Sequence, residues 1–119
     1  MTNKRRKPPV LAYLGEDDYL FASYAHADSE WVYPEIEWLT NSGIRIWYDE
    51  GIKGGSSWTE ELANLLDQSA GVLFFVSENA TSSKNVTNEI YFALEVNKPV
   101  LIITHEVPVL PAGLRLGLG

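Results

Sequence analysis

The sequence alternates between short apolar runs and segments with helical periodicity, and this alternation limits the fold more than any other feature. Val72–Val76 and Val100–Ile103 are continuous apolar runs of strand length, which is typical of buried parallel strands. Residues 19–24 and 44–48 are rich in aromatic and β-branched side chains and predict two more strands. We therefore expect an α/β fold, an open parallel sheet of four to five strands with helices on both faces.

Three segments between these strands have helical periodicity and carry start or stop signals. In the first, we expect Asp28 to cap the helix and Gly43 to end it, with Pro34 either bending the helix or delaying its regular part. The second opens on a capping box, Ser57-Trp-Thr-Glu60. The third has an apolar face between Val86 and Asn97. Sheets of this kind bind ligands at the carboxyl ends of their strands, so we expect the functional residues there.

The charge is divided between a basic amino-terminal segment and an acidic remainder. The net charge is −7, although residues 4–7 are all basic. The rest of the chain has five basic residues against sixteen acidic ones, a balance of −11. It lacks the clustered cations that bind nucleic acids and anionic membranes. We expect residues 1–16 to be a flexible basic tail, residues 17–119 to be the folded domain, and neither nucleic acid nor membrane to be a partner.

Several classes of site are excluded by what the sequence lacks. There is no cysteine, which excludes disulfides and zinc–thiolate sites. No apolar run reaches the roughly 18–20 residues that span a bilayer, and no signal peptide is apparent, so we expect a cytoplasmic protein. The loop at residues 50–57 has three glycines but no phosphate-binding GxxxxGK[ST] pattern. A dinucleotide would thus be a substrate in a cleft, and we expect neither a metal nor a bound cofactor.

Three groups of residues lie in an order and spacing known from one family. They are Phe21-Ala-Ser-Tyr24 with Asp28; Gly43–Asp49 with Ile52, Gly55 and Trp58; and Leu73–Ser77 with Ser83 and Glu89. Together they cover roughly residues 17–110 and resemble the TIR (Toll/interleukin-1 receptor-like) domain family, in particular its bacterial members. The resemblance implies a flavodoxin-like sheet whose last strand follows Gly119, in a longer protein that carries a sensor domain.

The resemblance to the enzymatic members of the family implies that Glu89 is catalytic. Those members cleave the nicotinamide–ribose bond of NAD+ and release ADP-ribose or a cyclic ADP-ribose. A carboxylate near the ribose stabilises the oxocarbenium ion while nicotinamide departs as a neutral molecule. At 100° per residue, Glu89 lies about 60° from Val86 on the apolar face. We expect it to border a cleft, whereas the helical pattern alone favours an exposed glutamate.

The resemblance and the strand ends also single out residues for substrate binding. They are Phe21, Ser23, Tyr24, His26, Asp49, Ser57, Trp58 and Asn85. Phe21 and Tyr24 can also pack in a core, and core packing is the favoured role of Trp47 and Trp58. Capping or turn formation competes for Asp49 and Ser57. Asn85 stands where many active members have tryptophan, four residues before the glutamate.

Two functions follow from these residues. The first is an NAD+ glycohydrolase that acts in bacterial antiphage defence and is activated when TIR domains associate. The second is a non-catalytic TIR adaptor that assembles through the glycine loop and the helix from Asn85. Asn85 favours the adaptor and Glu89 favours the enzyme. A phosphoacceptor receiver domain is rejected, because Asp17 and Asp18 precede the first strand and Ser77 follows the third.

Overall fold

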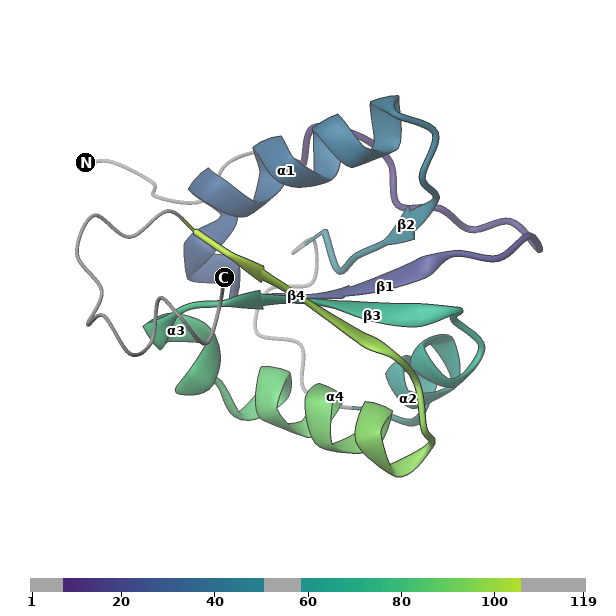
Figure 1. Cartoon of the computed structure of the whole chain (residues 1–119), viewed down its shortest axis with the longest axis vertical. Helices are drawn as coiled ribbons and strands as arrows, with labels where there is room; N and C mark the ends of the chain where they lie inside the picture. Colours follow the sequence, from purple (N-terminus) through teal and green to yellow (C-terminus); the bar gives the residue numbers. More distant parts are fainter. Residues whose placement is uncertain (1–7, 51–58, 106–119) are drawn as a thin grey trace.

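A parallel sheet lies between α1 (Ser29–Asn41) on one face and the helices α2 (Glu60–Asp67) and α4 (Lys84–Glu95) on the other (Figure 1). The structure is a computed structural model that describes residues 8–50 and 59–105. In these residues the sheet has the order β2-β1-β3-β4, and every neighbouring pair is parallel. The strands are β1 (Leu20–Ser23), β2 (Ile46–Trp47), β3 (Gly71–Val76) and β4 (Val100–Thr104). The predicted fold class is confirmed.

The helices alternate with the strands, as the sequence predicts. They are the 3₁₀ turn η1 (His26–Asp28), α1 (Ser29–Asn41), α2 (Glu60–Asp67), α3 (Glu78–Thr81) and α4 (Lys84–Glu95). α1 covers one face of the sheet, and α2 and α4 cover the other (Figure 1). The short helix α3 is not among the three helices that the sequence predicts; the Ser77 side chain starts it by accepting a hydrogen bond from the Ala80 amide at 2.9 Å.

The ends of α1 and α2 depart in part from the predicted signals. α2 is capped by Thr59, which accepts from the Leu62 amide at 3.2 Å, and not by Ser57, which lies outside the described residues. Asp28 stands at the N-cap position of α1 but does not cap it. Its φ of −95° and ψ of 9° lie outside the extended conformation from which a cap reaches the first turn. Pro34 lies inside α1, and Gly43 follows the helix with a φ of +97°.

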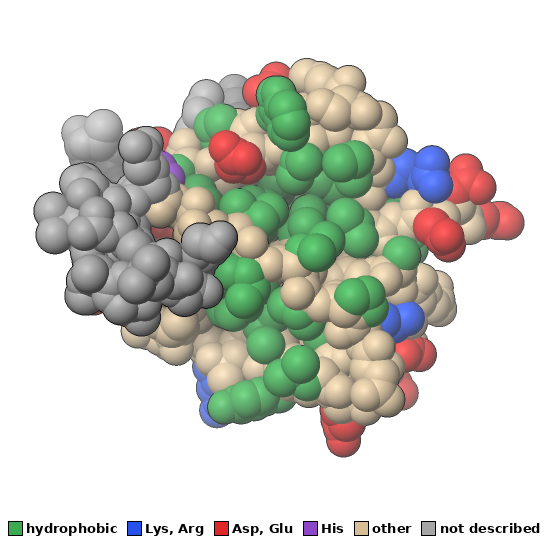
Figure 2. Space-filling view, viewed as in Figure 1, with side chains coloured by type: hydrophobic (Ala, Val, Ile, Leu, Met, Phe, Trp, Pro, Cys, Tyr) green, Lys and Arg blue, Asp and Glu red, His purple; other side chains and the backbone are tan. Residues whose placement is uncertain are grey.

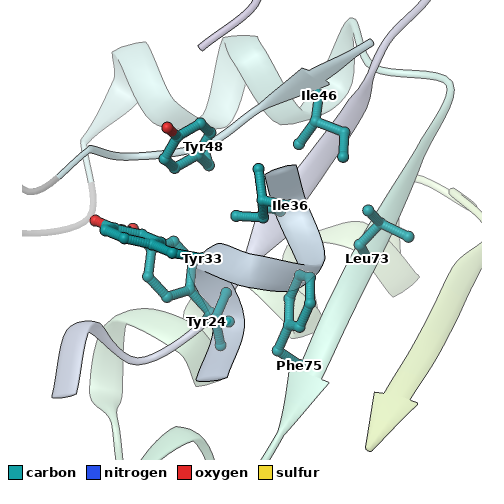
Figure 3. Close-up of a cluster of buried hydrophobic side chains, with 9 residues drawn as sticks. Tyr24, Tyr33, Ile36, Ile46, Tyr48, Leu73 and Phe75 are labelled. Atoms are coloured by element: carbon teal, nitrogen blue, oxygen red, sulfur yellow. The ribbon is translucent and has the colours of Figure 1, made fainter. Parts of the chain in front are cut away.

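The core under α1 is rich in tyrosine (Figure 3). Tyr24, Tyr33 and Tyr48 pack with Ile36 and Phe75 in one buried cluster. The Tyr24 and Tyr33 rings meet edge to face at 5.9 Å between centroids, and the Tyr33 and Tyr48 rings at 5.7 Å. Such rings contribute apolar area while their hydroxyls need hydrogen-bond partners. This face of the sheet therefore carries polar groups inside an otherwise apolar core.

The core on the α2 and α4 face is more apolar. Phe21, Leu66, Val72 and Ala93 are all fully buried there. Trp47 stacks on Phe21 with centroids 5.0 Å apart and planes at 28°. Trp47 is thus a core residue, as the sequence analysis favoured. Because successive strand residues face opposite ways, β1 supplies a side chain to each core in turn.

β4 is less buried than the sequence predicts. Leu101 and Ile102 are 51% and 62% exposed, whereas the continuous apolar run indicated a buried strand. In the described residues β4 pairs only with β3, so it lies at the edge of the sheet. Tyr91 and Leu94 of α4 are also exposed, and apolar side chains spread over this side of the molecule in Figure 2.

Residues 10–13, which the sequence analysis assigned to the amino-terminal tail, run beside β2. The Tyr13 amide donates to the Ile46 carbonyl at 2.9 Å. Val10 and Ala12 pack against the tyrosine-rich core. The basic residues 4–7 lie outside the described part of the chain. Within the described part, no helix is long and apolar enough to cross a membrane.

Candidate functional site at the carboxyl edge of the sheet

Glu89 turns from α4 toward the carboxyl end of β1. The Ser23 hydroxyl, fully buried at the last position of β1, donates to Glu89 Oε1 at 2.5 Å. β1 is the strand from which the chain first proceeds outward to β2 and then returns to β3 on the other side. Glu89 therefore lies at the point where the strand order reverses, which is where open α/β sheets bind ligands.

The surroundings of Glu89 favour its protonated form. Burial raises the pKa of Glu89 to about 8, the Ser23 hydrogen bond opposes the rise, and the Asp49 carboxylate adds to it. The three effects act as expected, because burial and a like charge disfavour a carboxylate while a donated hydrogen bond favours it. A strongly shifted carboxyl group at a strand end is a recognised property of functional sites.

His26 and Asp49 form a polar pair near Glu89. His26 Nε2 lies 3.5 Å from Asp49 Oδ2, and their side chains are 20% and 28% exposed. The His26 ring also meets the Tyr24 ring edge to face at 5.2 Å. These two side chains thus combine a fixed position with access to solvent, so they are able to contact a ligand.

Tyr24 holds the backbone of this site in place. Its side chain is buried, and its hydroxyl donates to the Asp49 carbonyl. The Tyr24 and Tyr33 hydroxyl oxygens are 3.2 Å apart. Burial and the Tyr33 hydrogen bond raise the pKa of Tyr24 far above its ordinary value, so this hydroxyl stays protonated as a donor. Tyr24 therefore positions Asp49 through the backbone.

A second acidic residue at the same edge, Asp28, is buried and joins two loops. Asp28 accepts hydrogen bonds from the Ser77 hydroxyl and, at 2.7 Å, from Asn79 Nδ2. The bonds connect the turn after β1 to the start of α3, across the reversal of strand order. The sequence analysis did not predict this link, because Asp28 resembled a helix cap. Ser77 directly after a strand was the one available signal.

The structure brings five of the predicted site residues together. They are Ser23, Tyr24, His26, Asp49 and Glu89. Asn85 lies one helical turn before Glu89 on α4 and is half-buried. Phe21 is not among them, because it is fully buried in the core under α2 and α4. Ser57 and Trp58 lie outside the described residues. No group of metal-ligating side chains was found among the residues that the structure describes.

Two hollows lie at the other end of the sheet, away from Glu89. They measure about 230 and 200 Å³ and share Gly43, Ile44 and Arg45. Arg45 Nε donates to the Asp18 carbonyl at 2.6 Å, and its guanidinium lies 5.7 Å from the centroid of the Tyr13 ring. This guanidinium is therefore already engaged by its neighbours.

Comparison with known proteins identifies the family and the fold. The family model described as "TIR domain" matches residues 20–116. The TIR domains of the activated Roq1 resistosome, which directly recognises the pathogen effector XopQ, have a similar structure with a TM-score of 0.61 and 22% sequence identity. The match covers 84% of this chain and 63% of that one. A search of curated protein sequences found no match.

Proposed function

Because the chain belongs to the TIR domain family, we propose that it is an NAD+ glycohydrolase with Glu89 as its catalytic residue. The observation that carries the proposal is the position of Glu89, which is bound to Ser23 at the reversal of strand order. The reaction adds water to NAD+ and yields nicotinamide, ADP-ribose and a proton; attack by a ribosyl hydroxyl or adenine nitrogen in place of water gives a cyclic product.

The chemistry requires a negative charge beside the ribose. As the nicotinamide–ribose bond breaks, the pyridinium takes the bonding electrons and leaves neutral, while positive charge develops on the ribose. A carboxylate fixed beforehand stabilises that charge without reorganising. Ser23 fixes the Glu89 side chain, because its hydroxyl donates a hydrogen bond to Glu89 Oε1 at 2.5 Å. His26 and Asp49, which are partly exposed, contact the rest of the substrate.

Substrate binding and the ionisation of Glu89 are coupled in this proposal. Burial holds the pKa of Glu89 near 8, so the free domain at pH 7 has mostly the neutral acid. The cationic nicotinamide ring favours the carboxylate and lowers that pKa when it binds. Glu89 therefore loses its proton as NAD+ enters, and the charge appears where the transition state needs it.

Association of several TIR domains activates the enzyme in this proposal. The Roq1 protein is an activated assembly with TIR domains, which supports the same mode of action here. Further parts of the proposal are a sensor domain in the same chain or in a partner, a cytoplasmic location and a role in bacterial antiphage defence. The exposed apolar residues of α4 and β4 favour a second candidate, a non-catalytic adaptor acting through TIR–TIR association.

The test measures nicotinamide release from NAD+ by protein clustered on vesicles through an affinity tag. We expect Glu89→Gln and Glu89→Ala to lower turnover by about 10²–10³, the effect of removing a preorganised electrostatic group. Glu95→Gln is the matched control, because Glu95 is an exposed glutamate on the same helix. Equal turnover by wild type and both Glu89 variants removes Glu89 from the reaction. Association without turnover favours the adaptor.

A further inference from the structure

The segment that carries Asp49 lies beyond the end of its strand. β2 ends at Trp47, so Tyr48, Asp49 and Glu50 are positioned by contacts from other parts of the chain. One set of contacts comes from the tyrosine core: Tyr24 donates to the Asp49 carbonyl, and the Tyr33 hydroxyl donates to the Glu50 carbonyl at 3.4 Å.

The second set of contacts comes from residues 10–13, which we call the strap. The Ala12 amide donates to Glu50 Oε2 at 2.6 Å, and the Tyr48 hydroxyl donates to the Val10 carbonyl. These bonds flank Asp49 on both sides in the sequence. In Figure 3 Tyr48 extends over the same core as Tyr24 and Tyr33. Hydrogen bonds to a charged acceptor are the stronger kind, so Glu50 is the firmer of the two attachments.

Asp49 transmits the position of this segment to the site. Its carboxylate lies 3.5 Å from His26 Nε2, and it also acts electrostatically on Glu89. The Asp49 carboxylate, which contacts His26, is thus positioned by a segment that the strap holds. A displacement of the strap therefore moves Asp49 and changes the electrostatic field at Glu89.

We propose that the strap sets the position of Asp49 at the site, and that Glu50 is the positioning residue through which it acts. The effect on turnover rests on the proposed glycohydrolase function, whereas the placement of Asp49 does not. A domain or partner that draws the amino-terminal segment away from β2 releases Asp49. The strap thereby connects whatever precedes it in the chain to the ionisation of Glu89.

The test follows the titration of the Glu89 side chain by NMR of carboxyl-labelled protein. Asp49→Asn removes the neighbouring charge and serves as the reference, with a titration midpoint lower by roughly one pH unit. We expect Glu50→Ala to lower the midpoint toward the same value, because Asp49 is no longer held near Glu89. Glu50→Gln keeps an acceptor for the Ala12 amide and therefore keeps the midpoint. Glu35→Ala, an exposed glutamate of α1, is the matched control.

Tyr48→Phe provides a second route, since it removes the bond to Val10 and keeps the buried ring. We expect it to move the midpoint in the same direction by a smaller amount. In clustered protein assayed at pH 9, where Glu89 is mostly ionised in every variant, Glu50→Ala also lowers kcat/KM for NAD+ by roughly tenfold, because Asp49 no longer contacts the substrate. Glu50→Gln restores it. An unchanged midpoint in folded Glu50→Ala or in Tyr48→Phe, with Asp49→Asn shifted, overturns the proposal. This readout is independent of turnover, so an inactive wild type contradicts the glycohydrolase function alone.

Discussion

The two ends of the parallel strands, which form the carboxyl edge and the amino edge of the sheet, differ in the kind of groups that line them. At the carboxyl edge, side-chain hydrogen bonds join elements far apart in sequence, as between Ser23 and Glu89 or between Asp28 and Asn79. At the amino edge, backbone bonds such as that from the Ala70 amide to the Tyr19 carbonyl join the connections, beside two hollows. The comparison teaches that a hollow alone does not indicate a functional site. Buried, hydrogen-bonded polar side chains at the carboxyl ends of the strands indicate it better.

The largest expected effect is the pH dependence of kcat/KM, which we expect to depend on the carboxyl edge and not on the amino edge. If the Glu89 carboxylate is the active form, a pKa of about 8 leaves roughly 1% of the free enzyme active at pH 6. Because Glu89 must lose its proton to become active, kcat/KM rises with pH and levels off above pH 8. The total rise is about a hundredfold. Nicotinamide release measured between pH 6 and 9 checks this. Arg45→Gln, at the amino edge, leaves the profile unchanged, and a flat wild-type profile would contradict the role of Glu89.

The next effect is a loss of stability when the carboxylate of Asp28, which joins the two loops, is removed. Asp28→Ala leaves the donors of Ser77 and Asn79 without their buried acceptor, and we expect a loss of about 2–3 kcal/mol in the free energy of unfolding. Asp28→Asn keeps one acceptor oxygen and loses less. Urea unfolding measures both, with Glu30→Ala on the exposed first turn of α1 as the control. Equal losses from Asp28→Ala and Glu30→Ala would show that the link contributes nothing.

Glu89 also affects stability, with a sign fixed by its raised pKa. Between its ordinary pKa near 4.5 and about 8, the folded state holds the proton more tightly than the unfolded state, so stability falls as pH rises. Glu89→Gln does not titrate. We expect it to exceed wild type by about 2 kcal/mol at pH 9, since solvent screens a partly exposed group, and by little at pH 4. Thermal unfolding at both values tests this, and a pH-independent difference refutes it.

The smallest effect tests the amino edge, where backbone geometry matters more. Gly43 has a φ of +97°, and a Cβ there would meet no atom within 4 Å. Gly43→Ala is therefore strained only by its backbone, and we expect a loss of about 1–2 kcal/mol. Gly43→Asn tolerates this conformation better and loses less. Unfolding curves measure the free energy of unfolding of both variants. A larger loss for Gly43→Asn than for Gly43→Ala would indicate that packing, and not backbone conformation, requires glycine at this position.

The sequence analysis was most successful where a pattern is local. Strand β3 and the stop at Gly43 followed directly from apolar runs and glycine. The cap of α2 was misplaced, because Ser57 and Thr59 both satisfy the same residue preference. β4 was predicted to be more buried than it is, since an apolar run does not reveal whether a strand lies at the edge of the sheet.

By itself the sequence determined the alternating α/β fold and the family, because periodicity and ordered motifs are properties of neighbouring residues. Through the family resemblance it also named Glu89 as the candidate catalytic residue. Only the tertiary structure decided what surrounds Glu89: Ser23, 66 positions away, donates to it, while burial and, to a lesser degree, Asp49 from beyond β2 raise its pKa. The tertiary structure also showed that Asp28, which was expected to cap a helix, links two loops through hydrogen bonds. The physical reason is that hydrogen bonds and charge fields depend on distance in space, which parallel strands set only once they pair.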